Sequence, residues 1–321
     1  MNRTALLSRP LGGLDGLLAC PVHHTPTTRR DASYICDTCG EVGHIRGPVR
    51  CFELNPDPFY EGRYKNRTKF IPKNDGFWAT LPLAIVLQGY PTAVARALPA
   101  NSTVLELGCA GGVAWFGKRY RMVGLDLSSD AIPLASHDYA LLIQGDATKI
   151  PLQDRSVTGV ISSCFFEHFD DEGKARILRE CRRVIRPGGK VVFYYDIWTE
   201  NFLISAYRRT RPEDYEAQFL NGDGHIGYAV PSHNEQLFRD AGFMIEYQTF
   251  HERTPILTNS CWQKFSSWPG LMGAYAKLNR ALTAGAFWLP SLALIAVMDK
   301  TVGRLCPYSH ARCVTTIARA P

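Results

Sequence analysis

The stretch from residue 103 to residue 195 constrains the fold of this chain more than any other feature. Short apolar runs, which we predict as strands, alternate there with amphipathic stretches; they cover 103–107, 122–126, 141–144, 157–162 and 190–195. A helix is predicted over 171–185, because Ala175, Leu178, Cys181 and Ile185 fall on one face. Strands that alternate with helices at this spacing predict a doubly wound, mostly parallel α/β sheet with helices on both faces.

The C-terminal part completes the predicted sheet and interrupts it once. A helix over 235–241 precedes a strand over 243–250, and a final strand over 312–318 brings the predicted count to seven. About sixty residues separate the last two strands, which is too long for a hairpin loop. We therefore predict a helical insertion over about 251–310, which contains an uncharged run from 281 to 298.

Length and composition suit one large catalytic domain with a small appendage. The chain has 321 residues, of which 45% are hydrophobic and 21% charged, as in soluble globular proteins. The net charge of +6 is modest and does not by itself indicate nucleic acid. Residues 1–19 do not form a signal-peptide core, so the expected location is cytoplasmic. We predict a module over 1–54, a linker and helical cover over 55–100, and the main domain over 101–321.

A glycine-rich loop after the first strand of the predicted sheet is a candidate cofactor site. Residues 104–112 read Val-Leu-Glu-Leu-Gly-Cys-Ala-Gly-Gly. Small residues let the backbone approach a ligand, and the following helix offers unpaired N–H groups. Asp126 ends the next strand, where a carboxylate can accept hydrogen bonds from both hydroxyls of a ribose. These features suit a nicotinamide dinucleotide as well as S-adenosylmethionine.

Two further motifs separate these cofactors. Gln-Gly-Asp-Ala ends the third strand at 144–147, and Arg-Pro-Gly-Gly-Lys precedes the fifth at 186–190. With the loop and Asp126, they resemble the class I S-adenosylmethionine-dependent methyltransferases with their Rossmann-like fold, especially the ubiquinone and menaquinone biosynthesis type, over about residues 100–200. Many members of that family have glycine where this chain has Ala110, so the loop is narrower here.

The resemblance implies a role for each matching position. The implied contacts are Glu106, Gly108, Cys109, Ala110, Gly111 and Gly112 for the methionine part, Asp126 for the ribose, and Asp146 and Ala147 for the adenine, with Leu127 and Cys164 completing the cofactor-binding set. A structural alternative stays open, in which Asp126 and Asp146 only cap the helices that follow them.

Two histidines are candidate catalytic bases. Methyl transfer is an in-line displacement, so a base is needed only when the acceptor starts protonated. His168 follows the fourth strand and is one candidate, but the resemblance implies packing or capping for its Glu-His pair, which recurs in family members with different acceptors. His225 lies in the glycine-dense segment 221–228, which we interpret either as part of an acceptor pocket or as a simple turn.

Residues 20–39 carry the pattern of a metal site. The pairs Cys20/His23 and Cys36/Cys39 have two-residue spacings and are separated by twelve residues, which suits a closed, structural zinc site. His24 stays an alternative to His23. Residues 18–52 resemble the small zinc-binding activator of tRNA, rRNA and protein methyltransferases, which has cysteine in place of His23. The resemblance implies a zinc-ribbon-like module fused in cis, with a metal-free version of the same fold as the alternative.

The sequence leaves two classes of methyl acceptor open. The apolar run 281–298 predicts a lid or a helix at a membrane surface, and hence a small or lipid-like acceptor methylated at oxygen. Alternating basic and aromatic residues over 63–70, and the zinc module, favour RNA instead. Against RNA, residues 164–166 do not resemble the Asn-Pro-Pro-Tyr motif of amino-directed nucleic-acid methyltransferases. A non-catalytic regulator that binds the cofactor and an NAD-dependent oxidoreductase are the alternatives of other classes.

Overall fold

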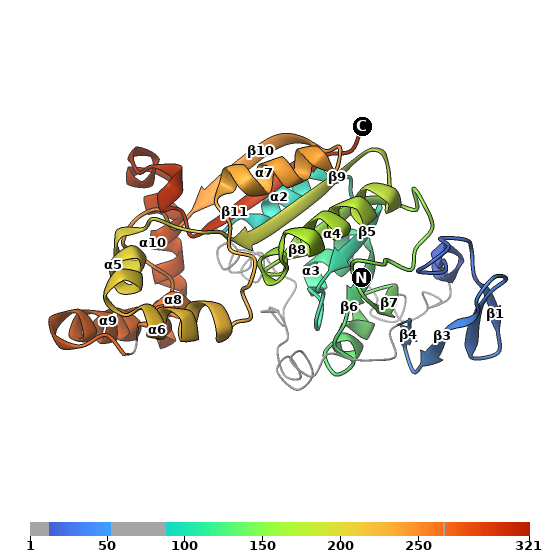
Figure 1. The fold of residues 1–321 in the computed structure, drawn as a ribbon, viewed down its shortest axis with the longest axis horizontal. Helices are drawn as coiled ribbons and strands as arrows, with labels where there is room; N and C mark the ends of the chain where they lie inside the picture. Colours follow the sequence, from blue (N-terminus) through green and yellow to red (C-terminus); the bar gives the residue numbers. More distant parts are fainter. Residues whose placement is uncertain (1–12, 53–87, 266) are drawn as a thin grey trace, which may run out of the picture.

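The computed structural model describes residues 13–52, 88–265 and 267–321 (Figure 1). Its strands are β1 (Thr28–Arg30), β2 (Ser33–Cys36), β3 (Gly40–Arg46), β4 (Val49–Cys51), β5 (Thr103–Leu107), β6 (Arg121–Asp126), β7 (Leu141–Gln144), β8 (Val157–Ser163), β9 (Ile185–Asp196), β10 (Met244–His251) and β11 (Cys313–Arg319). Its α-helices are α2 (Tyr90–Ala97), α3 (Ala114–Arg119), α4 (Asp171–Val184), α5 (Phe202–Thr210), α6 (Pro212–Tyr215), α7 (Pro231–Asp240), α8 (Asn259–Lys264), α9 (Gly270–Leu282) and α10 (Trp288–Lys300).

All of these strands belong to one sheet in the order β1-β2-β3-β4-β7-β6-β5-β8-β9-β11-β10. The predicted count of seven was wrong for this sheet, which has eleven strands, because β4 pairs in parallel with β7 and adds the four N-terminal strands to it. The edge of β7 would otherwise expose unpaired backbone groups. The sheet is mixed and not mostly parallel, since five of its strand pairs are parallel and five antiparallel.

Helices cover both faces of the sheet, as a doubly wound α/β fold requires. Neighbouring residues of one strand point to opposite faces, so Val104 and Leu105 of β5 belong to different cores. Helices α4 and α7 pack on the face that contains Leu105, and α2 and α3 pack on the face that contains Val104 (Figure 1). These two layers leave the carboxyl ends of the parallel strands as the edge where a ligand can bind.

Helix α4 shows how the local sequence determines these elements. It begins after Asp170, whose side chain accepts a hydrogen bond from the backbone N–H of Gly173 at 2.8 Å. Ile177, Leu178 and Cys181 lie on one face and are fully buried against the sheet. The predicted helix over 171–185 and the predicted strands over 103–107 and 141–144 agree with α4, β5 and β7 to within a residue.

A separate helical lobe lies at one end of the molecule, opposite β1–β4 (Figure 1). Helices α8, α9 and α10 lie between β10 and β11, while α5 and α6 follow β9. Both groups share one aromatic core, in which Tyr207 packs against Phe265 and Trp268 with ring centroids 5.0 and 5.2 Å apart. The lobe is therefore built from two stretches of chain and not only from the predicted insertion.

Part of the predicted organisation lies outside the described residues. The basic and aromatic segment 63–70 and most of the predicted linker over 55–100 fall there, while the remainder of that linker contains α2. The predicted module over 1–54 is described from residue 13 to residue 52.

Candidate functional site

The glycine-rich loop leaves β5 at Leu107 and enters α3 at Ala114. Gly108 has a φ of +60°, and a Cβ atom there would lie 2.5 Å from the ring of Phe165, so only glycine fits. Ala110 has a φ of +45°, which is strained for a residue with a side chain. The strain is held by a hydrogen bond of 2.6 Å from the N–H of Ala110 to Asp126 Oδ2.

Asp126 joins the loop to the end of β6. Its other carboxylate oxygen, Oδ1, accepts a hydrogen bond of 2.9 Å from the N–H of Ser128. A carboxylate has about four acceptor positions, so these two bonds alone do not exhaust it. The bond to the N–H of Ser128 agrees with the capping alternative, and the contact with the ribose stays a prediction.

Glu106 lies beneath the loop and not on its surface. It is fully buried on β5, and its carboxylate accepts a hydrogen bond from the Tyr139 hydroxyl. The N–H of Val113, at the end of the loop, donates in turn to the Tyr139 oxygen at 3.0 Å. Glu106 thus supports both ends of the loop, and its contact with the methionine part stays a prediction.

Asp146 follows β7, directly beside the end of β6. Its carboxylate accepts hydrogen bonds from the N–H and the hydroxyl of Thr148, at 2.8 and 2.7 Å. The N–H of Gly145 donates to the carbonyl of Asp126 at 3.0 Å, which ties the two strand ends together. The remaining predicted cofactor positions lie around the same edge: Cys109 and Ala147 are buried, Leu127 is half-buried, Gly111 and Gly112 continue the loop, and Cys164 is exposed after β8.

The segment after β8 brings the two predicted histidines together. The rings of His168 and His225 lie 4.8 Å apart, although 57 positions separate them in the sequence. His168 Nδ1 is 3.1 Å from the carbonyl of Gly224. The two segments approach so closely at Gly227 that a Cβ atom there would lie 1.8 Å from the carbonyl oxygen of Phe169. Segment 221–228 therefore packs closely against the segment after β8, and its part in an acceptor pocket stays a prediction.

A chain of hydrogen bonds orients the His225 ring. Its Nδ1 atom is 2.7 Å from the hydroxyl of Tyr228, which donates to Asp196 Oδ2 at 3.3 Å. Because the Tyr228 proton points to Asp196, the Tyr228 oxygen accepts the proton of His225 Nδ1. This arrangement leaves the lone pair of the His225 ring on Nε2.

Burial controls the charges in this cluster. It lowers the pKa of His225 to about 4, against the opposing effect of Asp196, and it also lowers the pKa of His168. Burial and the nearby Asp196 carboxylate raise the pKa of Glu167 to about 8. Asp196 is ionised because Arg312 outweighs the effect of burial and lowers its pKa to about 2. At neutral pH both imidazoles are therefore neutral, and each has one unprotonated ring nitrogen.

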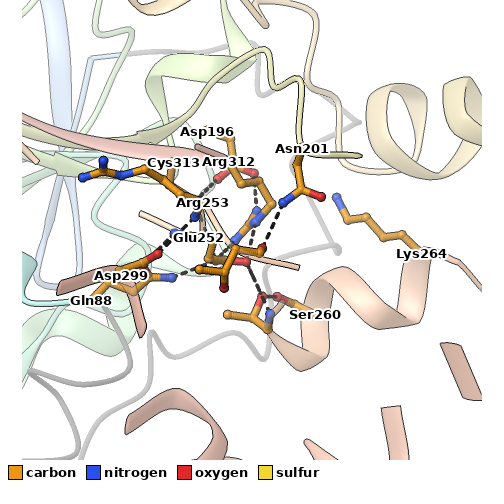
Figure 2. Close-up of polar contacts among 12 residues, drawn as sticks. Gln88, Asp196, Asn201, Glu252, Arg253, Ser260, Lys264, Asp299, Arg312 and Cys313 are labelled. Carbon is orange, nitrogen blue, oxygen red and sulfur yellow. Dashed lines mark hydrogen bonds and ion pairs between the residues drawn. The ribbon is translucent and has the colours of Figure 1, made fainter. Parts of the chain in front are cut away.

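A buried ion network connects this cluster to the helical lobe, and Figure 2 shows it with Arg312 between Asp196 and Glu252. Arg312 Nη1 donates to Asp196 at 2.8 Å, and Arg312 Nη2 donates to Glu252 at 2.6 Å. Gln88 donates to Glu252 at 2.7 Å. Asp299 of α10 accepts hydrogen bonds from the backbone N–H groups of residues 252 and 253 at 2.6 and 3.0 Å. These contacts fix α10 to the strand ends beside the site.

The four predicted metal ligands lie together in the N-terminal module. Their ligand atoms are all within 4.8 Å of one another and belong to Cys20, His23, Cys36 and Cys39. The Cys20 and Cys39 sulfurs are 3.4 Å apart, close to the separation of about 3.8 Å that Zn–S bonds of 2.3 Å give in a tetrahedron. Backbone N–H groups of residues 39 and 38 lower the pKa of Cys36 to about 5. His23, and not His24, faces the sulfurs, so the donor set fits zinc.

The N-terminal module packs against β7, the strand that is followed by Asp146, the residue predicted to bind the adenine. Arg46 Nη2 donates to the Gln144 side chain at 3.0 Å, and the N–H of Phe52 donates to the Gln144 carbonyl at 2.8 Å. Arg50, which is buried, donates from Nε and Nη2 to the two oxygens of Asp15 at 3.0 and 3.1 Å. The module therefore holds Gln144, two residues before Asp146, from the outer side of the sheet.

Sequence reasoning missed several residues of this site. Tyr139 and Arg312 carry no local signal, because a tyrosine or an arginine in such a segment looks like a surface residue. Asp196 does carry one: it is a carboxylate directly after the apolar strand of residues 191–195, at the edge where ligands bind. Tyr228 stands in the glycine-dense segment, but its partner Asp196 lies 32 residues away.

Known proteins resemble parts of this chain. Residues 105–193 match the family model described as a methyltransferase domain. The tRNA (carboxymethyluridine(34)-5-O)-methyltransferase ALKBH8 of Macaca fascicularis is 31% identical over 105 residues, which are 32% of this chain and 16% of that relative. Demethylmenaquinone methyltransferase of Thermotoga maritima is 28% identical over 166 residues, which are 45% of this chain and 71% of that relative.

Solved structures also align with this chain at low sequence identity. A chain of the complex between the Haloferax volcanii Trm112 methyltransferase activator and a methyltransferase aligns with a TM-score of 0.46 and 18% identity, over 76% of this chain and 94% of that chain.

The family match covers the parts of the chain that carry the predicted cofactor site. It spans β5 to β9, and with them the glycine-rich loop, Asp126 and Asp146. The alternative of an NAD-dependent oxidoreductase was therefore wrong. The chain contains a class I S-adenosylmethionine-dependent methyltransferase domain.

Proposed function

We propose that this protein transfers the methyl group of S-adenosylmethionine to a hydroxyl oxygen of a lipid-like acceptor. The observation that carries the proposal is the pair of neutral imidazoles, His168 and His225, beside the glycine-rich loop. Phe165 links the two sites, because its ring lies against Gly108 and the short helix Phe166–His168 follows it directly. A neutral base at this position is useful when the acceptor must lose a proton.

The cofactor would lie against the ends of β5, β6 and β7. The loop backbone from Gly108 to Gly112 would contact the methionine part, Asp126 the ribose hydroxyls, and Asp146 with Ala147 the adenine. S-adenosylmethionine supplies an electrophilic methyl group on a positively charged sulfur. The loop supplies alignment, which accounts for much of the rate of an in-line displacement.

His225 would act as the base. The acceptor oxygen forms a bond to the methyl carbon, the bond between sulfur and that carbon breaks, and the hydroxyl proton goes to His225 Nε2. The imidazolium that results is stabilised by the Tyr228 hydroxyl and, through it, by ionised Asp196. Arg312 holds Asp196 in place on its other side. His168 packs edge-on against the His225 ring and limits its rotation.

The helical lobe supports an acceptor with a large apolar part. The lobe adjoins segment 221–228, which carries His225. Lys264 of α8 forms an ion pair with Asp223 of that segment and lies over the ring of Phe219. Its packed core is rich in aromatic side chains, and Phe219 of that core lies under the Lys264 ammonium group. The Thermotoga maritima relative is named for demethylmenaquinone, a name that agrees with an apolar acceptor.

The test is transfer of a labelled methyl group from S-adenosylmethionine into a fractionated cell extract. We expect label in organic-soluble material, little label with His225→Asn, and normal labelling with the exposed control His137→Asn. Equal labelling by both variants would exclude His225 as the base. Cofactor binding without any transfer would support the regulator alternative.

RNA is a second candidate acceptor. Two observations favour it: the N-terminal module packs against β7, and one relative is named for tRNA methylation. Label that nuclease treatment releases would support it over the lipid-like acceptor.

We also infer that Cys20, His23, Cys36 and Cys39 bind a structural zinc ion. The grouped sulfurs and the fit of their spacing to a tetrahedron support this assignment. Elemental analysis of the purified protein should give one zinc per chain, and Cys36→Ser should lose it. Cys306→Ser, a free cysteine in the helical lobe, is the matched control and should retain zinc. Metal-free protein with an intact module would overturn the inference.

A further inference from the structure

The helical lobe exposes more apolar surface than the rest of the described chain. The described residues include seventeen exposed large apolar side chains, and ten of these lie between residues 271 and 308. Soluble proteins rarely expose contiguous apolar patches of this kind without a partner.

Helix α9 presents its apolar residues as a stripe on its outer face. Leu271, Tyr275, Leu278 and Leu282 follow one another at spacings of four, three and four residues, which places them on one side of a helix. All four are exposed, and Leu271 is 90% exposed. The opposite face packs into the lobe through Gly273 and Ala276. Apart from Tyr275, whose ring lies 5.5 Å from that of the buried Trp262, the stripe is therefore not part of the protein core.

The next segments also expose apolar side chains. Leu294 and Val297 of α10 are exposed, as are Val302 and Leu305 after it, and Leu305 is 87% exposed. Helix α10 is apolar on nearly all sides, so its buried residues do not account for its composition. We call the exposed apolar residues of 271–305 the lobe surface.

The charged residues in the stretch that carries the lobe surface are mostly basic, whereas the other stretch of the lobe also exposes the acidic Glu213 and Glu216. Residues 254–310 contain five basic residues, Lys264, Lys277, Arg280, Lys300 and Arg304, and a single acidic residue, Asp299. Asp299 is buried and bonded to backbone N–H groups, so it does not reach the surface. The last four basic residues are all exposed. Apolar side chains bordered by basic ones suit a membrane that contains anionic lipids.

The length of the helices and the packing of α10 favour a position at the membrane surface over a membrane span. No single helix in the described ranges is long and apolar enough to cross a membrane; the pair Gly270–Leu282 and Gly285–Lys300 meets both measures only when taken together, with a bend of 77°. Leu292, Ile295 and Asp299 of α10 are buried against the rest of the protein. Because Asp299 is bonded to the residues after β10, α10 stays attached to the domain.

We propose that the lobe surface docks this protein on an anionic lipid membrane, with α9 lying in the plane of the interface. This inference deepens the proposed function and rests on it only for the origin of the acceptor, which the membrane would supply. The ten cysteines, all of them among the described residues, form no disulfide, which suits a reducing compartment, and we assign the binding surface to a cytoplasmic leaflet.

The first test is sedimentation of the full-length protein with vesicles, without cofactor or acceptor. We expect binding to vesicles of phosphatidylcholine with 30% phosphatidylglycerol, and weak binding to phosphatidylcholine alone. Leu278→Asp with Leu282→Asp should lower the partition coefficient at least about tenfold, because two charges enter the apolar face. Met244→Asp, at an exposed apolar position on β10, is the matched control and should bind as the wild type does.

The second test separates charge from apolar contact. Arg280→Gln with Arg304→Gln should lower binding to the anionic vesicles about 25-fold, or about fivefold for each charge removed. Arg176→Gln with Arg179→Gln, two exposed positions on α4, should change it little.

Wild-type protein that does not bind vesicles would overturn the inference, even if methyl transfer were observed. A dimer in sedimentation velocity that Leu278→Asp dissociates would overturn it too, by assigning the lobe surface to a second copy. Loss of methyl transfer with vesicle binding retained would count against the proposed function alone.

Discussion

Replacing Glu167 by glutamine should change how the stability of this protein depends on pH. Glu167 is 1% exposed, and neither of its carboxylate oxygens has a hydrogen-bond partner among the described residues. Burial, together with the charge of Asp196, raises its pKa from 4.5 to about 8. The folded protein therefore holds this proton more tightly than the unfolded chain does.

The sign and size of the effect follow from that difference. A carboxyl group with a raised pKa contributes stability below pH 4.5, and this contribution is lost as the pH rises toward 8. Each pKa unit corresponds to about 1.4 kcal/mol, so at pH 7 about 3 kcal/mol has been lost. Glutamine has nearly the same shape and does not titrate, so the variant should not show this loss.

This difference in stability can be measured by urea unfolding of the wild type and of Glu167→Gln at pH 5 and pH 8. The free energy of unfolding of Glu167→Gln should gain about 3 kcal/mol relative to the wild type between these two pH values. Glu172→Gln, on the exposed start of α4, is the control and should follow the wild type. Parallel curves for Glu167→Gln and the wild type would show that Glu167 is ionised in the folded protein, and would refute the reasoning.

Three further predictions test other parts of the site. Asp126→Ala should weaken S-adenosylmethionine binding by about 1 to 3 kcal/mol in calorimetric titration, and unchanged affinity would remove its assignment to the ribose. Arg312→Met leaves the buried carboxylates of Asp196 and Glu252 uncompensated, so it should cost about 3 to 5 kcal/mol in urea unfolding; a loss below about 1 kcal/mol would contradict the network. Tyr228→Phe separates His225 from Asp196, so kcat should fall about tenfold or more while the KM for S-adenosylmethionine stays the same; an unchanged kcat would contradict the proposed proton path.

The sequence predicts those parts of the fold that depend on neighbouring residues. The strand of residues 103–107 and its glycine-rich loop are readable, because a tight turn from strand to helix requires small residues at fixed positions. The position of Asp126 follows from the same local pattern. The spacing of the cysteines and His23 also predicts their grouping, because short turns between paired ligands leave little freedom.

Contacts between distant segments were not readable in this way. The pairing of β4 with β7 joins residues that are 93 positions apart, and nothing in the strand of Val49–Cys51 indicates its partner. Asp196, Glu252 and Arg312 come from the ends of three different strands, and Glu252 and Arg312 resemble surface residues in the sequence. Only the fold shows that Asp196 and Glu252 are buried and paired with Arg312, and that Asp196 reaches His225 through Tyr228.

The two additions to the methyltransferase domain act on different sides of its site, and this separates their expected effects. The N-terminal module contacts the domain through β7, where Arg46 and Phe52 bind Gln144, two residues before Asp146. The lobe contacts it through the ion network at the ends of β9, β10 and β11. Removing zinc with a chelator should therefore weaken S-adenosylmethionine binding and leave vesicle binding unchanged. The substitutions Leu278→Asp and Leu282→Asp should do the reverse. If chelation changed both S-adenosylmethionine binding and vesicle binding, the N-terminal module would stabilise the whole fold and not only the part of the site predicted to bind the adenine.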